Sequence, residues 1–383
     1  TYTLCIFGTF ITRSGVISSV HAFALSNIGP MFAGFLIFII LVSAYLVIKR
    51  LPLLKSDQHF ESVISRESAF LINNLVFLGA CFAVLWGTIF PIVSEAIRGV
   101  KVTVGAPFFN SVNVPIGLFL LFLTGVGPLV AWRKTSPRLL KKIFLRPTLI
   151  SLLGLVIMLI AGMRHFYALV SFTLAIFVTA TIVDEFHRGA RARMKTNQES
   201  YPVALWHLLL KNKRRYGGYI VHFGIVVLFI GFTGQAFGTD SEAKLKFGES
   251  MNIRNYTLTY RDLRQLEDPN KIVWKAKMDV YKNGKKIDTI YPNKHFYKVQ
   301  QQPTTEVVLH STLLEDLYVV LVQPNEDNSA LFKVYLNPLV NWVWIAGLIV
   351  TLGTFIILLP EEKGKAPSRK QIAKKRKVSK VMA

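Results

Sequence analysis

Long apolar stretches separated by shorter polar ones dominate the pattern along this chain. A helix needs about 20 mainly apolar residues to cross a bilayer, and seven stretches reach or approach that length. The predicted membrane helices are Met31–Ile48, Ala69–Val93, Pro115–Trp132, Pro147–Gly162, Phe166–Val183, Gly217–Phe237 and Leu339–Pro360. The pattern therefore predicts a multispanning membrane protein.

The first apolar stretch, Thr1–Thr12, is too short to span a bilayer. No positively charged region precedes it, which argues against a signal peptide. We interpret it as the end of a truncated membrane helix, so the chain is expected to be a fragment or one half of a split protein.

A different pattern occupies Gly238–Asn337, where about a hundred mostly polar residues lie between two predicted spans. Short runs with alternating, β-branched or aromatic residues indicate strands bounded by turns. The predicted strands are Asn252–Arg261, Val273–Tyr281, Lys286–Ile290, Thr305–Leu309 and Tyr318–Val322. Asn283-Gly284 predicts a type I′ hairpin, because both residue types tolerate positive φ. We expect a small antiparallel β-domain, either a sandwich or a partial barrel.

Alternate connections between the predicted spans are rich in lysine and arginine. Most of the 45 basic residues lie in four such segments: Lys49–Arg66, Arg133–Arg146, Asp184–Tyr216 and the tail after Pro360. The short connections in between carry only Arg13, Arg98, Lys101 and Arg164. Because basic loops stay in the cytoplasm, the alternation predicts a cytoplasmic C-terminus and places Gly238–Asn337 on the outer face.

Composition agrees with this class, since 52% of the 383 residues are hydrophobic. The formal net charge of +23 is spread over loops and tail, which argues against a nucleic-acid partner and favours contact with membrane lipid. Cys5 and Cys81 lie in separate apolar runs, so neither a disulfide nor a zinc site is expected. The predicted domains are a helical core over 1–237, a β-domain over 238–337, a last span over 338–360 and a basic tail over 361–383.

His222 is the most informative single residue, because it lies inside an apolar span. Ionisable residues within a bilayer are costly and point to function. Gly218 lies one helical turn earlier on the same face and leaves room beside the imidazole. A haem with His222 as axial ligand would suit this arrangement. A buried histidine hydrogen-bonded to a neighbouring helix is the alternative.

His21 is a second candidate ligand, predicted to lie just outside the membrane on the outer face. Arg13 precedes it and could pair with a haem propionate, since a guanidinium suits a carboxylate. An interfacial histidine with a structural arginine is the alternative reading, and the same applies to His165. We expect structural roles for the remaining histidines and for three carboxylates at helix ends: His59, His187, His207, His295, His310, Glu95, Asp184 and Glu185.

Several long segments closely resemble the CcmF family, the membrane subunit of the bacterial cytochrome c haem lyase. Two of them carry the candidate histidines, in Arg13-Ser-Gly-Val-Ile-Ser-Ser-Val-His21-Ala-Phe and Gly217-Gly-Tyr-Ile-Val-His222. The resemblance runs from Gly8 to about Pro360 and includes Val104–Asn110, Phe229–Phe237 and Pro292–Glu306.

The resemblance implies roles for both histidines. His21 matches the catalytic, outer-face ligand for haem delivered by a haem chaperone, and His222 matches an axial ligand of a permanent transmembrane haem b. In the family each has a partner histidine earlier in the sequence, and a tryptophan-rich haem-handling motif also lies earlier. This chain lacks both partner histidines and the motif. The resemblance therefore implies that the chain holds half of each ligand pair.

The implied fold is an all-α polytopic membrane protein of about seven full transmembrane helices and a truncated one, with a small antiparallel β-domain inserted on the periplasmic side. The implied cellular location is the bacterial inner membrane. The implied activity is a haem lyase acting in cytochrome c maturation, although bond formation could belong to an associated subunit. A haem transporter and a non-catalytic scaffold are the alternatives.

The implied cofactors are haem b, transiently bound haem and a quinol electron donor. The implied partners are a haem chaperone, apocytochrome c with its presenting thiol-redox subunits, and an N-terminal half of the same protein.

Overall fold

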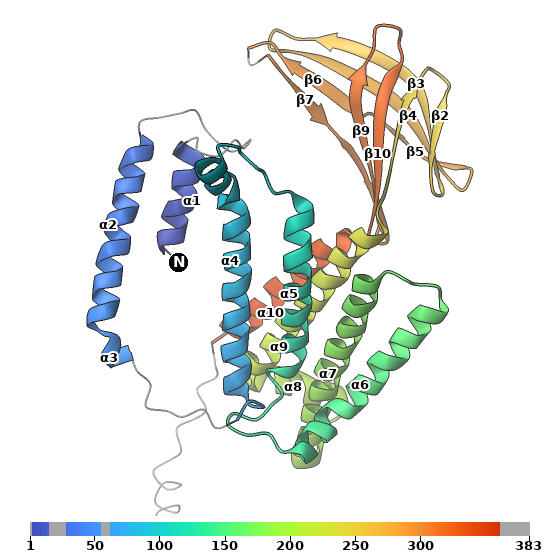
Figure 1. Cartoon of the computed structure of the whole chain (residues 1–383). Coiled ribbons are helices and arrows are strands. Elements are labelled where there is room, and N and C mark those ends of the chain that lie inside the picture. The colour runs from blue at the N-terminus through green and yellow to red at the C-terminus, as the bar shows by residue number, and fades with distance from the viewer. Residues whose placement is uncertain (1, 15–27, 55–61, 300, 361–383) are drawn as a thin grey trace, which may run out of the picture. The chain divides into compact units, whose positions relative to one another are not determined.

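The structure is a computed structural model that describes residues 2–14, 28–54, 62–299 and 301–360 (Figure 1). His21, His59 and the predicted tail over 361–383 lie outside these residues. The chain divides into two compact units, residues 1–140 and 141–383, and each is described by itself.

The first unit is helical and comprises α1 (Tyr2–Ser14), α2 (Ile28–Lys49), α3 (Leu51–Leu54), α4 (Arg66–Arg98) and α5 (Ala106–Val126). Gly87 lets α4 approach the start of α5, because an added Cβ there would lie 2.7 Å from the rings of Phe108 and Phe109. The segment Val104–Asn110 thus supplies the aromatic side chains that pack against Gly87 of α4. Cys5 and Cys81 are free thiols on exposed positions.

The second unit begins with α6 (Pro137–Ile160), most of which belongs to it, and α7 (Phe166–Asn197). A short helix, α8 (Tyr201–Lys211), leads to α9 (Lys213–Thr233) and the 3-10 helix η1 (Gly234–Phe237). Ten strands follow, and the last helix is α10 (Asn341–Leu358).

Seven described helices are long and apolar enough to cross a membrane, which confirms the predicted helical class. The predicted ends were wrong in two places where a proline was taken as a helix start. Pro115 and Pro147 lie inside α5 and α6, as neighbouring groups in membrane helices can satisfy the freed backbone. The helix α7 also runs on through polar residues 184–197, where helix-favouring Ala, Arg, Met and Lys predominate.

The helices α9 and α10 make a close contact lined by glycine. An added Cβ at Gly217 would lie 3.1 Å from the carbonyl oxygen of Gly353 on α10. At Gly224 and Gly231 it would meet Val350 and Val343 of α10 at 2.7 and 2.8 Å. These α9 glycines recur every seven residues on one face, and small residues allow membrane helices to approach closely.

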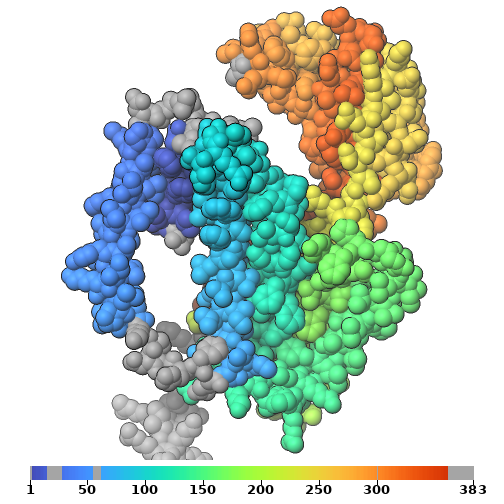
Figure 2. All heavy atoms as spheres, in the orientation of Figure 1, coloured from blue at the N-terminus to red at the C-terminus, as the bar shows by residue number. Residues whose placement is uncertain are grey.

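The strands form two antiparallel sheets that pack face to face as a sandwich (Figure 1). In the space-filling view the sandwich is the yellow and orange lobe (Figure 2). One sheet has the order β1-β10-β9-β8, and the other has the order β2-β3-β4-β6-β7 with β5 also paired to β4. The strand bounds are Thr239–Leu245, Ser250–Ile253, Tyr256–Glu267, Lys271–Lys282, Lys285–Ile290, Asn293–Tyr297, Gln302–Glu306, Val308–Ser311, Glu315–Pro324 and Ala330–Pro338 for β1 to β10.

Alternating inward residues of both sheets form the core of the sandwich. Tyr260 of β3 and Phe332 of β10 meet edge to face, with ring centroids 4.9 Å apart. Leu258, Met278 and Leu321 are fully buried beside them. The two-residue period predicted this half-buried pattern.

The predicted Asn283-Gly284 hairpin is confirmed, since both residues have positive φ (50° and 79°) and join β4 to β5. Two predicted strands were wrong as single elements. Asn252–Arg261 is a hairpin whose turn places Arg254 at a φ of 47°. Thr305–Leu309 is divided at Val307, where the chain leaves one sheet (β7) and enters the other (β8).

Candidate functional site

The candidate site lies on the face of α9 that carries Gly218 and His222. With 3.6 residues per turn, these residues share a face that differs from the one lined by Gly217 and Gly224. A third face of α9 meets α7, where Phe186 lies 4.9 Å from the ring of Tyr216 and 6.3 Å from that of Tyr219. The contacts with α7 and α10 thus leave the histidine face of α9 as a separate surface.

One ring nitrogen of His222, Nδ1, is buried without a hydrogen bond from the described part of the chain. A buried imidazole nitrogen without a partner is costly. Among the described residues, no neighbouring helix supplies a hydrogen bond to Nδ1, so this atom stays available to a further group.

The other described histidines face polar groups. His165 caps α7 by accepting from the Ala168 amide at 3.4 Å, and His187 lies 3.1 Å from the Tyr201 hydroxyl. In the sandwich, Nδ1 of His310 lies 3.2 Å from the Asp288 carboxylate. Nδ1 of His295 lies 3.1 Å from the Glu306 carboxylate but, like Nδ1 of His222, is buried without a hydrogen-bond partner among the described residues. These contacts are those of structural histidines.

Gly218 provides open space beside His222. Among the described residues, nothing lies within 4 Å of the position that a Cβ of Gly218 would take. At Gly217, one residue earlier, an added Cβ would meet Ile357 at 2.7 Å. The two adjacent glycines therefore differ: the first permits helix packing, and the second leaves a gap on the histidine face.

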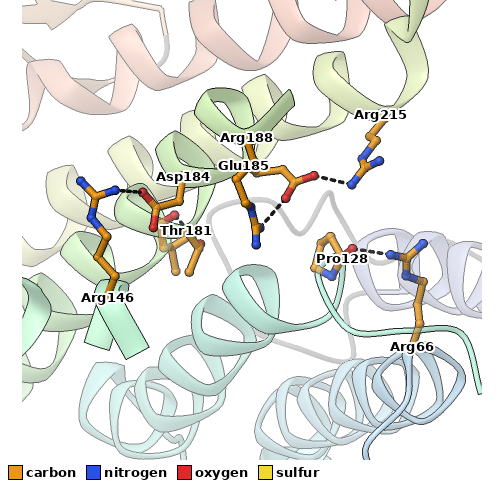
Figure 3. Close-up of polar contacts among 9 residues, drawn as sticks. Arg66, Pro128, Arg146, Thr181, Asp184, Glu185, Arg188 and Arg215 are labelled. Atoms are coloured by element: carbon orange, nitrogen blue, oxygen red, sulfur yellow. Dashed lines mark hydrogen bonds and ion pairs between the residues drawn. The ribbon is translucent and has the colours of Figure 1, made fainter. Parts of the chain in front are cut away.

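A shared carboxylate holds the beginning of α9 to α7. Glu185 is buried; it accepts from Arg188 at 2.6 Å and also binds the Arg215 guanidinium (Figure 3). The neighbouring Asp184 pairs with Arg146 of α6 at 3.1 Å. Both acidic residues were expected to be solvated or paired at a helix end. They are paired, but the predicted position was wrong, because α7 continues to Asn197.

At the opposite end of α9, Thr233 hydrogen-bonds Ser171 of α7 at 2.6 Å, so α9 is attached to α7 at both ends.

A second carboxylate, that of Glu199, links α7 to α8 through hydrogen bonds. Arg193 donates two hydrogen bonds to Glu199, at 2.7 and 3.0 Å, and His207 lies 3.0 Å from the same carboxylate. The Arg193 guanidinium is the main cause that holds the pKa of Glu199 at about 2. Glu199 therefore stays ionised and structural, and His207 has the structural role that we expected.

In the first unit, Arg66 contributes a comparable structural contact at the beginning of α4. Its guanidinium donates to the carbonyl oxygen of Pro128, and its amide donates to Ala131 at 2.8 Å (Figure 3). These bonds hold the segment after α5 against the start of α4.

The predicted site residues are only partly covered by the structure. Gly218 and His222 lie one turn apart on α9, as expected, and Arg13 is the penultimate residue of α1. His21 lies outside the described residues, so its relation to Arg13 stays a prediction. Within the described ranges, no group of three or more His, Cys, Asp or Glu side chains could hold a metal ion. His222 can therefore supply one ligand of a metal centre rather than a complete set.

Sequence reasoning missed two features that position His222. The first is the glycine repeat Gly217, Gly224 and Gly231, whose seven-residue spacing was readable as a helix-packing face. The second is the bond between Glu185 and Arg215, thirty residues apart on different helices, for which the sequence carries no local signal.

The apolar helices and the sandwich define a polytopic membrane protein. Its candidate cofactor site is the span before the sandwich, where Nδ1 of His222 has no partner among the described residues. Residues 236–338 match the family model described as the CcmF C-terminal beta-sandwich. Over nearly its whole length the chain is similar to members of the CcmF family.

Named relatives are cytochrome c-type biogenesis proteins. CcmF of Pseudomonas fluorescens is 32% identical over 369 residues, covering 94% of this chain and 53% of the relative. CcmF of Escherichia coli K12 is 28% identical and covers 97% of this chain and 56% of the relative. A solved structure titled cytochrome c heme lyase CcmF superposes with a TM-score of 0.72 at 26% identity, over 94% of this chain and 53% of that one. The chain thus spans about half the length of the curated relatives it matches.

Proposed function

We propose that this chain acts in cytochrome c maturation as part of a CcmF-type haem lyase, which attaches haem to apocytochrome c. The similarity to CcmF proteins over 94% of the chain supports the family function. The observation that carries the proposal is the buried Nδ1 of His222, which finds no partner in the described ranges and lies beside space that those ranges leave open at Gly218.

His222 and Gly218 fit one side of a transmembrane haem b. The imidazole would supply one axial ligand, and the missing Gly218 side chain would leave room for the porphyrin. When bound, haem b supplies one-electron redox chemistry, for which we propose a membrane quinol as electron donor. The residues of this chain position the ligand, since the contacts of α9 with α7 and α10 hold the helix that carries His222.

His21 and Arg13 would handle the haem that is the substrate. In this proposal His21 ligates the haem delivered by a chaperone and is the catalytic residue, while the Arg13 guanidinium pairs with a propionate. The reaction adds each apocytochrome thiol across a haem vinyl group. The sulfur bonds one vinyl carbon and a proton is taken up by the other, so the addition is redox-neutral and the protein contributes orientation.

The proposed location is the bacterial inner membrane, with the sandwich in the periplasm. The alternation of basic connections supports this orientation. In this proposal the sandwich would lie on the side where apocytochrome c, its thiol-redox subunits and the haem chaperone meet the lyase.

An absorption spectrum of the complete lyase tests the role of His222. We expect His222→Ala to abolish the b-type reduced-minus-oxidised spectrum, because the iron loses an axial ligand. His207→Ala is the matched control, since His207 pairs with Glu199, and it should retain the spectrum. A wild-type spectrum in His222→Ala would contradict the assignment.

A second substitution separates the two proposed haem sites. His21→Ala should prevent capture of chaperone-delivered haem, measured by co-purification, while leaving the b-type spectrum in place. Loss of both signals together would indicate a general folding defect and would remove the support for a separate substrate-haem ligand.

A further inference from the structure

The turn between β8 and β9, formed by Thr312, Leu313 and Leu314, exposes two large apolar side chains. Leu313 is 68% exposed and Leu314 is 69% exposed. Adjacent leucines at the tip of a turn are unusual in a water-facing sandwich, because turns favour polar residues and glycine.

Three hydrogen bonds attach this turn to the beginning of α10. The Leu339 amide donates to the carbonyl oxygen of Leu314 at 2.8 Å, and the Trp342 indole donates to that of Leu313 at 2.9 Å. The Asn341 side-chain amide donates to the carbonyl oxygen of Thr312 at 2.6 Å. The turn therefore lies level with the first helical turn of α10.

In a membrane that α10 spans, the first turn of α10 would lie at the bilayer surface. The apolar helix α10 begins at Asn341, directly after β10, and is long enough to span. Two tryptophans stand in its first turn, and Trp344 is 72% exposed. Tryptophan is enriched where membrane helices meet the lipid headgroups. The β8–β9 turn, which is hydrogen-bonded to this part of α10, would then contact the same lipid headgroups.

We propose that the β8–β9 turn is a membrane anchor, in which Leu313 and Leu314 insert into the bilayer that α10 spans. The lipid would cover the two side chains that the described residues leave exposed. The inserted turn adds a third attachment to the two covalent connections through η1 and Leu339–Val340. Because a lobe joined only by adjacent connections could tilt, this third point would set the orientation of the sandwich on the membrane.

Site-directed spin labelling of the full-length lyase in phospholipid nanodiscs tests the anchor. After Cys5 and Cys81 are replaced by serine, nitroxide labels are attached to Leu313→Cys and Leu314→Cys, one at a time. Leu266→Cys is the matched control, since Leu266 is also an exposed leucine. It lies ten residues along β3 from Tyr256, which hydrogen-bonds Glu315 beside the turn. Ten strand residues cover roughly 33 Å.

We expect the labels at 313 and 314 to collide more with oxygen, which concentrates in lipid, than with a water-soluble nickel chelate, and the label at 266 to show the reverse. Preferential collision with the chelate at both turn positions would overturn the proposal. An immobilised spectrum shielded from both reagents would also overturn it, because a protein partner would then cover the turn. All three substitutions are at exposed positions, and circular dichroism checks that each variant is folded.

Discussion

At the scale of single residues, the adjacent glycines of α9 have opposite surroundings. Gly217 is enclosed by Gly353 and Ile357 of α10, whereas Gly218 borders open space among the described residues. The same substitution should therefore disturb helix packing at Gly217 and leave it intact at Gly218.

Gly217→Ala should lower stability by about 1–3 kcal/mol, because the added methyl group overpacks the contact with α10. Gly218→Ala should leave stability close to that of the wild type, since no described residue lies within 4 Å of its Cβ. Thermal unfolding of both variants in detergent measures the difference. Equal losses would contradict the assignment of the two faces.

A larger side chain at the open position addresses the proposed cofactor instead. Gly218→Leu should fold normally but retain less haem, because the side chain would occupy the space beside His222. The haem-to-protein ratio from the absorption spectrum is the measurement. An unchanged ratio would argue against a porphyrin on this face.

Glu185 matters because two guanidiniums depend on one buried carboxylate. Glu185→Ala should cost about 1–3 kcal/mol, as lost hydrogen bonds to charged groups commonly do. Arg215→Ala should cost less in that background than alone, since its carboxylate partner is already gone and only its contacts with residues such as Tyr216 remain. A double-mutant cycle by thermal unfolding measures this coupling, and additive losses would show that the two residues act independently.

At the scale of elements, three strands of the sandwich share one carboxylate. Asp279 of β4 accepts from Lys286 and Thr289 of β5 at 2.6 and 2.8 Å, and from Arg261 of β3 at 2.8 Å. The Lys286 ammonium is the largest cause that lowers the pKa of Asp279 to about 2.

A carboxylate with a lowered pKa stabilises the folded state above its unfolded pKa, and this contribution is lost as the pH falls through the folded value. The sandwich should therefore lose about 1–2 kcal/mol between about pH 4 and pH 2 through Asp279. Urea unfolding across this range should be less pH-dependent in Asp279→Asn. The control is Asp262→Asn, at an exposed pair with Arg264, and an Asp279→Asn profile identical to that of the wild type would contradict the assignment.

The elements also show what hydrophobic patterning can predict. Apolar length identified the membrane helices, and Asn283-Gly284 identified a hairpin because its backbone demands positive φ. The division of Thr305–Leu309 was not predictable, since a strand that changes sheets at Val307 keeps the same local pattern. The site was predictable only as far as His222 and Gly218, which lie within one turn. Its supports come from α7 and α10, at distances along the chain that no local pattern encodes.

At the scale of the whole molecule, the proposed roles of His21 and His222 depend on the orientation in the membrane. After replacement of the native cysteines, Lys285→Cys in the sandwich should react with an impermeant thiol reagent added to spheroplasts. Thr196→Cys, at the end of α7, should react only after the membrane is permeabilised. Both positions are exposed, so burial does not explain a failure to react. Labelling of Thr196→Cys in intact spheroplasts would reverse the orientation.

During synthesis, the glycine-lined face of α9 exists for some time before α10 does. About a hundred residues separate Thr233 from Asn341, and at 5–20 residues per second the ribosome needs roughly 5–20 s to make them. Throughout that interval Gly217, Gly224 and Gly231 have no α10 to pack against. The sandwich is thus synthesised after α9 and before α10, the two helices to which it is joined. A ribosome that stalls before Asn341 would leave α9, with its histidine, in the membrane without its partner.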